Sequence, residues 1–235
     1  MPTPRLTTLA LAALLGTAVA CEGSTTGLLV TGATSGARVR LVNALTSSQA
    51  LDFAVDGQVA ASGIGFGSAS PYVSLTLASH RLQAQASGTG TTLVDFTRDL
   101  TTAGTFSLIP APGLSQFGAL FIADDPTAAA GQAKFRVVHV AAAPGAVSMY
   151  ITSPTADLSS ATPAVPNLAF GAASPYVAVA PGTYRIRITP AGNPSTTLLD
   201  TGNITVTAGS VRTLLVTDAP GGGLPTTLSV ITDAN

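Results

Sequence analysis

Apolar and polar residues alternate in many short segments of the chain, each bounded by glycine, proline, asparagine or serine. The alternation is clearest in residues 37–42 (ARVRLV), 51–55 (LDFAV), 72–77 (YVSLTL), 133–138 (AKFRVV) and 184–188 (YRIRI). A period of two is typical of a strand with one buried face. We therefore expect Val39, Leu41, Phe135 and Val137 to face a core. No segment shows the sustained period of an amphipathic helix.

One peptide occurs twice. Residues 66–73 (FGSASPYV) return as residues 170–177 (FGAASPYV), with Ser68 replaced by Ala172. Self-similarity over most of the chain indicates a tandem duplication. The repeated residues are turn formers, small residues and aromatics, which predicts a structural role for the peptide.

The repeat divides the chain into two modules of about 100 residues, each large enough to bury its own core. Short strands separated by glycine and proline turns predict an all-β fold of two tandem antiparallel β-sandwich modules, immunoglobulin-like in architecture. The expected organisation is a signal peptide at 1–20, a Ser/Thr/Gly-rich tether at 21–36, repeat 1 at 37–125, a linker at 126–132 and repeat 2 at 133–235.

The N-terminus reads as an export signal. Arg5 precedes an apolar run at residues 6–20, which is too short for a membrane span and ends directly before Cys21, the single cysteine. This segment resembles the bacterial lipoprotein signal, in which that cysteine is acylated. We expect a chain anchored to the lipid bilayer through Cys21 in the cell envelope, at the outer membrane or cell surface, which Glu22 permits. The alternative is cleavage after Ala20 and secretion.

The composition disfavours several classes of function. A net charge of -1 with 9% charged residues gives no basic surface, so nucleic acid is not an expected partner. Two histidines, which do not align between the repeats, and one cysteine make a zinc site hard to assemble, and no spaced calcium loop is present. We expect no metal and no cofactor. With one glutamate, no nucleophile elbow and no phosphate loop, we expect no enzyme.

Two hairpins are expected to carry ion pairs. Folding the chain around Gly88 brings Arg81 opposite Asp95, and the later hairpin brings Arg185 near Asp200. Opposite charges on neighbouring strands help to fix the register of a sheet. The alternative is a ligand clamp, which would need a third polar group supplied by the fold.

Aromatic residues of the repeated peptide are the candidates for binding. Tyr72 and Tyr176 follow proline and are expected at the rim of each sandwich, where they could bind sugar or peptide. Alternatively, each ring packs over a sheet end with its hydroxyl bonded to backbone. Phe66 and Phe170 are expected to be core plugs.

The sequence resembles the bacterial domain-of-unknown-function 4397 family at residues 37–44 (ARVRLVNA), at residues 51–57 (LDFAVDG) and at the repeated peptide. The resemblance covers nearly all of the expected mature chain, once per module. It implies envelope proteins, often lipoproteins, with all-β repeats and no established reaction.

The expected function is a non-catalytic binding or structural role in the cell envelope, with a polysaccharide or an envelope protein as partner. Two alternatives remain. One is a hydrolase or other enzyme that uses the aspartates near the module ends, which are Asp124, Asp125, Asp218 and Asp233. The other is a purely architectural surface spacer.

Overall fold

The computed structural model describes residues 36–47, 49–114 and 118–234. The expected signal peptide, Cys21 and nearly all of the tether lie outside these residues. Within them the chain forms strands and turns without a helix, which confirms the all-β class. Accordingly, this part of the chain contains no helix long and apolar enough to cross a bilayer.

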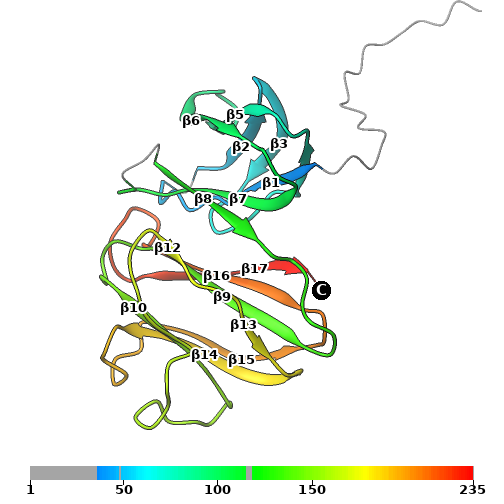
Figure 1. The fold of residues 1–235 in the computed structure, drawn as a ribbon. Helices are drawn as coiled ribbons and strands as arrows, with labels where there is room; N and C mark the ends of the chain where they lie inside the picture. The colour runs from blue at the N-terminus through cyan, green and yellow to red at the C-terminus, as the bar shows by residue number, and fades with distance from the viewer. Residues whose placement is uncertain (1–35, 48, 115–117, 235) are drawn as a thin grey trace, which may run out of the picture. The chain divides into compact units, whose positions relative to one another are not determined.

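Module 1 contains the first eight strands. They are β1 (Ala37–Leu41), β2 (Leu51–Val55), β3 (Gln58–Ile64), β4 (Val73–Leu75), β5 (Ser79–Ala86), β6 (Thr92–Asp99), β7 (Gly104–Pro110) and β8 (Ala119–Asp124). They form an inner sheet of order β4-β1-β7-β8 and an outer sheet of order β3-β2-β5-β6. The two sheets pack face to face as a sandwich (Figure 1).

Module 2 contains the remaining strands. They are β9 (Ala133–Val140), β10 (Val147–Thr152), β11 (Val165–Leu168), β12 (Ala172–Ala173), β13 (Val177–Val179), β14 (Gly182–Pro190), β15 (Leu199–Val206), β16 (Val211–Thr217) and β17 (Thr227–Ala234). The inner sheet has the order β12-β9-β16-β17, with β13 also paired to β9, and the outer sheet has the order β11-β10-β14-β15. In each inner sheet one pair is parallel, β1 with β7 and β9 with β16.

Each sandwich encloses its own apolar core. Val39 and Leu41 of β1 lie in the core of module 1, and Phe135 and Val137 of β9 lie in the core of module 2, all fully buried. The alternation in these strands therefore assigned the buried face correctly. The intervening residues, Arg40 among them, point to the opposite face of the inner sheet.

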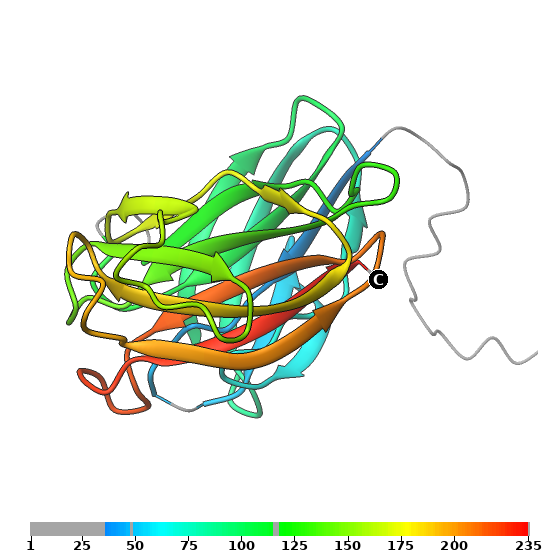
Figure 2. The same ribbon diagram turned by 90° about the horizontal axis from the view of Figure 1, so that it is seen from below.

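A third apolar cluster lies between the modules. Its fully or nearly fully buried members come from both inner sheets and from the residues that follow β1 and β7. They are Val42, Ala44, Ile109, Ala111, Val138, Val140, Leu215 and Ile231. The modules thus stack inner sheet on inner sheet in four layers, seen from the side in Figure 1 and along the stack in Figure 2.

The repeated peptide makes the same backbone contacts in both modules. The hydroxyl of Ser70 accepts a hydrogen bond from the Leu41 amide at 3.0 Å, and that of Ser174 accepts one from the Val137 amide, also at 3.0 Å. Each peptide therefore runs along the first strand of its module, at the edge of the inner sheet.

Candidate functional site

Two buried arginines lie at the centre of the module boundary. Arg40 in β1 and Arg136 in β9 occupy equivalent positions of the two repeats, and both side chains are 3% exposed. Because they alternate with core residues, they leave their own sandwich and point toward the other one. Each meets an aspartate at the end of the other module's edge strand.

Arg136 of module 2 binds module 1. Its Nη2 donates to Oδ1 of Asp124, and its Nη1 donates to the Ala123 carbonyl at 2.9 Å. Its Nε donates to the hydroxyl of Thr213 at 2.9 Å, and that hydroxyl donates to Oδ2 of Asp233 at 2.5 Å. One guanidinium is thereby tied to both modules.

Arg40 repeats the arrangement in the opposite direction. Its Nη2 donates to Oδ1 of Asp233 in module 2 at 2.5 Å, and its Nε donates to the Ser107 hydroxyl at 2.9 Å. Ser107 in turn donates to Oδ2 of Asp124 at 2.6 Å. We call these six residues, which are Arg40, Ser107, Asp124, Arg136, Thr213 and Asp233, the reciprocal network.

Charge is balanced within the reciprocal network, because two guanidiniums face two carboxylates whose side chains are fully buried. Burial alone would lower the pKa of Arg40, but the charges of Asp233 and Asp124 outweigh it and raise that pKa above its usual value. Buried charges are tolerated only when they are paired and hydrogen-bonded. The network meets both conditions, so it fixes how the modules dock.

The two candidate tyrosines border this network. The Tyr72 hydroxyl donates to Oδ2 of Asp124 at 2.8 Å, and the Tyr176 hydroxyl donates to Oδ2 of Asp233 at 3.1 Å. Guanidinium carbons of Arg40 and Arg136 lie 4.7 Å from the respective ring centroids. Burial and the nearby carboxylates raise the pKa of both tyrosines. Both hydroxyls contact carboxylates instead of backbone, and a binding role for the half-buried rings stays a prediction.

The structure places the two hairpin pairs in contact on the outer sheets. Arg81 Nε donates to Oδ1 of Asp95 at 2.9 Å, and Arg185 Nη2 donates to Oδ2 of Asp200 at 2.5 Å. These hydrogen bonds lower the pKa of Asp95 and of Asp200. Neither pair is directly opposite, because Arg81 faces Thr97 in the register and a β-bulge shifts the later hairpin. Both pairs are partly exposed and lie away from the module boundary.

The aspartates near the module ends are engaged by protein donors. Besides the two in the reciprocal network, Asp125 accepts a hydrogen bond from Lys134 at 2.5 Å, which lowers its pKa. Asp218 accepts the backbone amides of residues 142 and 143. Among the described residues, no group of three or more histidine, cysteine or acidic side chains is arranged to hold a metal ion.

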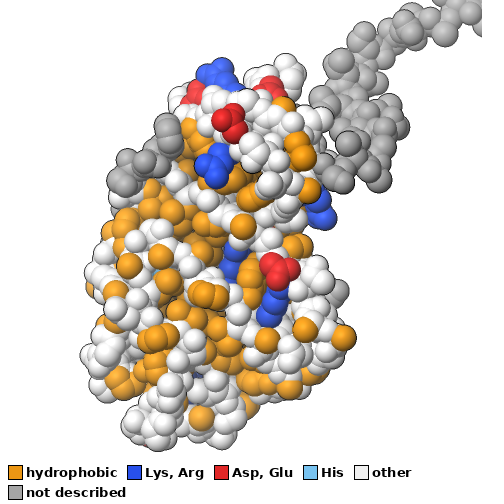
Figure 3. Space-filling view, viewed as in Figure 1, with side chains coloured by type: hydrophobic (Ala, Val, Ile, Leu, Met, Phe, Trp, Pro, Cys, Tyr) orange, Lys and Arg blue, Asp and Glu red, His pale blue; other side chains and the backbone are white. Residues whose placement is uncertain are grey.

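A groove of about 540 Å³ opens on module 1 between its edge strands β6 and β8. Phe96 and Arg98 line it from β6, Phe121 lines it from β8, and Leu114 lines it from the segment after β7. Phe170 of module 2 completes the wall, so the groove extends to the module boundary. On the face drawn in Figure 3, charged side chains gather on module 1 and at the boundary, whereas module 2 shows mostly apolar and uncharged surface.

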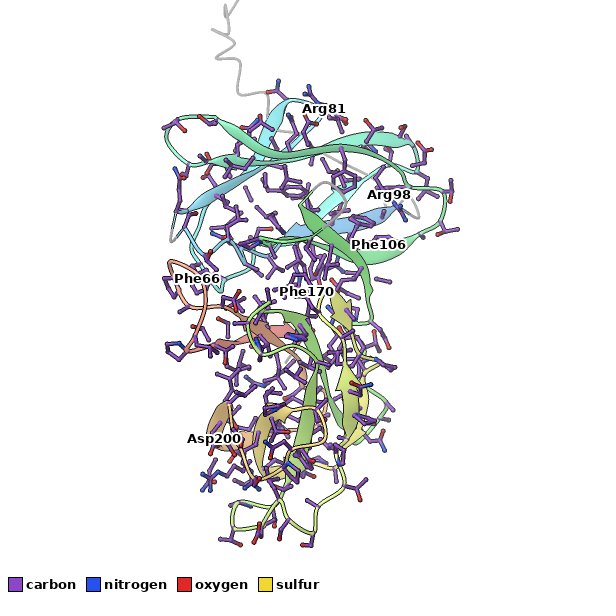
Figure 4. The ribbon with its side chains drawn as sticks, turned by 90° about the vertical axis from the view of Figure 1, so that its left-hand side faces the viewer. Phe66, Arg81, Arg98, Phe106, Phe170 and Asp200 are labelled. Carbon is purple, nitrogen blue, oxygen red and sulfur yellow. The ribbon has the colours of Figure 1, made fainter. Side chains whose placement is uncertain are left out.

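Aromatic rings pack tightly at one side of this groove. Phe106 stacks on Phe121 with centroids 5.2 Å apart, and Phe96 meets Phe121 edge-on at 6.1 Å. The Arg98 guanidinium lies over the Phe121 ring, 5.0 Å from its centroid. Figure 4 shows Arg98 and Phe106 on the same side of module 1. Alternation explains the placement, because Phe96 and Arg98 share the inward face of β6.

The expectation that Phe66 and Phe170 are core plugs is wrong. Both rings are half-buried, neither belongs to an apolar core, and Phe170 instead lines the groove between β6 and β8. The sequence identified the repeated peptide but gave no signal for the groove, because its wall combines segments from both modules.

The sequence and the structure were compared with known proteins. No curated protein matches the sequence. A solved structure that it resembles is CBMbc, a family CBM26 protein of Eubacterium rectale Amy13K in complex with maltoheptaose, at 12% identity and a TM-score of 0.27. The likeness covers 81% of this chain and 95% of that chain. At so low a TM-score it carries no argument about this chain.

The family comparison agrees with the duplication. The family model described as "Domain of unknown function (DUF4397)" matches residues 37–150 and 152–235. The first match includes β9 and part of β10, and both of these strands belong to the sheets of module 2. The boundary between the matches therefore differs from the boundary between the sandwiches. The two matches nevertheless span all of the described strands, and the chain therefore belongs to the DUF4397 family, in two tandem copies.

Proposed function

We propose that the protein is a lipid-anchored binding protein of the cell envelope with a non-catalytic role. Its two modules present one rigid surface to an envelope or extracellular polymer or protein. Acylated Cys21 holds the chain on the membrane, and the Ser/Thr/Gly-rich tether separates the folded part from the bilayer. The sequence before Ala37 supports the anchor, and the docking of the modules supports the rigid presentation.

The reciprocal network is the observation that carries the proposal. A hinge between two domains needs an interface that opens at small cost, whereas this one buries two ion pairs and an apolar cluster. Opening it would expose both at once. A fixed surface built from two copies of one module suits recognition of an extended partner or support of a structure.

The experiment is retention of residues 33–235, the compact unit that contains every described strand, on isolated envelope polymers. Peptidoglycan, lipopolysaccharide and capsule fractions are each titrated with the protein, and the fraction retained is measured after sedimentation. We expect saturable retention on at least one fraction. The control is the same protein unfolded in urea and diluted into the assay, which reports adhesion that does not depend on the fold.

Retention that never saturates, or that the unfolded control matches, would contradict polymer recognition. A protein partner or an architectural spacer would then be the better account. The enzymatic alternative has less support, because the aspartates on which it depends are held by arginine, lysine, hydroxyl or backbone donors.

A further inference from the structure

We propose that the groove between β6 and β8 binds an anionic amphiphile, with the acidic group at Arg98 and the apolar tail along the wall formed by Phe96, Leu114 and Phe170. This inference rests on the proposed binding role and names a ligand class for one site. The shared chemistry is a single acidic head on an acyl chain, whether it comes from a free fatty carboxylate or from an acidic phospholipid.

Charge is the first reason. Arg98 is the one charged residue among the described residues that line the groove. No described carboxylate lies within 4.0 Å of the Arg98 guanidinium, a property that Arg98 shares with Arg38, Arg187 and Arg212, but these three do not line the groove. The Arg98 guanidinium lies over the ring of Phe121. An exposed guanidinium beside an apolar wall complements an anion attached to an apolar body.

The packing around Phe121 is the second reason, because it disfavours a sugar or another planar ligand that would stack on this ring. A ligand that stacks needs one open ring face. Phe106 stacks on Phe121, Arg98 also lies over that ring, and Phe96 meets it edge-on. Phe121 therefore has little open face for a stacking ligand, whereas an acyl chain needs only apolar contact.

The position of the groove is the third reason. In module 2 the edge strands β15 and β17 approach each other closely. The equivalent strands β6 and β8 approach less closely, and the groove lies between them beside the partly buried part of the core. Its volume of about 540 Å³ falls in the range of about 300–1,000 Å³ that is usual for small-molecule sites.

The test is calorimetric titration of residues 33–235 with dodecanoate below its micellar concentration. Decanoate gives the length dependence, and dodecyl maltoside and dodecyltrimethylammonium are the neutral and cationic analogues. We expect one site, and affinity for dodecanoate about 15-fold above that for decanoate, from about fourfold per methylene. The cationic analogue should not bind at this site.

Two pairs of variants locate the site. Arg98→Gln should weaken dodecanoate binding about tenfold and leave that of dodecyl maltoside unchanged, whereas Arg81→Gln, on the same outer sheet, should change neither. Phe170→Ala should weaken every amphiphile that binds, and Phe66→Ala, its equivalent in the other repeat, should not. Figure 4 shows these two rings apart from each other, both at the level of the module boundary. Urea unfolding of each variant confirms that its fold is intact.

A second arm identifies the source of the ligand. Flotation with phosphatidylglycerol vesicles, compared with phosphatidylcholine vesicles, reports an acidic headgroup in a membrane. Binding that depends on Arg98 in either arm supports the proposal, and binding that ignores Arg98→Gln in both arms, or no saturable binding, overturns it. This failure would not change the result of the polymer retention experiment. If polymer retention failed and dodecanoate still bound, only the polymer would be excluded as a partner.

Discussion

A single side chain, Arg136, links the two modules through three different acceptors. Its guanidinium contacts a carboxylate and a carbonyl of module 1 and a hydroxyl of its own module. Removing it would leave the Arg40 guanidinium, 3.6 Å away, as the remaining cation beside the buried carboxylate of Asp124. Loss of one partner from a buried ion pair is among the most destabilising changes in a protein, at about 3–5 kcal/mol.

We predict that Arg136→Met lowers the free energy of unfolding by about 3–5 kcal/mol. The matched control is Arg185→Met, which removes an arginine of the same module from a partly exposed ion pair and should change stability far less, because solvent screens such pairs. Urea unfolding followed by circular dichroism measures both. Equal losses for the two variants would contradict the role given to the reciprocal network.

The sequence indicated one kind of ion pair and not the other. Arg81 and Asp95 lie 14 residues apart in one hairpin, so local alternation and turn position are enough to bring them together. Arg40 and Asp233 lie 193 residues apart, and their contact exists only because two sandwiches dock. Alternation could show that Arg40 leaves its own core, but it contains no information about which surface meets it.

The repeated peptide of module 1 pairs with its own inner sheet and also contacts the other module. In module 1 its Gly67 has a φ of 70° and lies against β17 of module 2, where an added Cβ would stand 2.1 Å from Oγ and 3.1 Å from Cβ of Ser229. Glycine is thus required twice at this position, for the backbone angle and for the close approach of the modules.

We predict that Gly67→Ala destabilises the protein by about 1–3 kcal/mol more than Gly63→Ala does. Gly63 has nearly the same φ, 69°, but no described atom within 4 Å of its added Cβ, so it isolates the strain of the backbone. Thermal or urea unfolding gives the difference. Adding Ser229→Gly to Gly67→Ala should recover part of the loss, and no recovery would place its cause elsewhere.

Strand positions were predictable in outline, since β1, β2 and β9 begin where the alternation begins. The pairing of strands was less accessible. The sequence predicts an antiparallel sandwich and does not reveal the parallel pairs β1–β7 and β9–β16, because alternation has the same period in both kinds of sheet. Parallel pairing is set by connections over the whole module, which no single segment encodes.

The molecule as a whole is expected to be held at a membrane by one residue. We predict that Cys21→Ser moves the protein from the membrane fraction of the producing cells to the soluble fraction, because the thiol that would carry the lipid is gone. Immunoblotting of the fractions measures the shift, and Ser24→Ala, three residues later, is the control. If the Cys21→Ser protein stayed in the membrane fraction, lipid anchoring through this residue would be wrong.

Each module supplies an arginine to an aspartate of the other module, and this symmetry affects how the pairing of the modules depends on protein concentration. Each module presents the same patch to the other, as the two subunits of a twofold-symmetric dimer do. A dimer of separate chains dissociates at low protein concentration. Here the short linker holds the two modules at an effective concentration on the order of millimolar, so the modules of a single chain are paired however dilute the protein is.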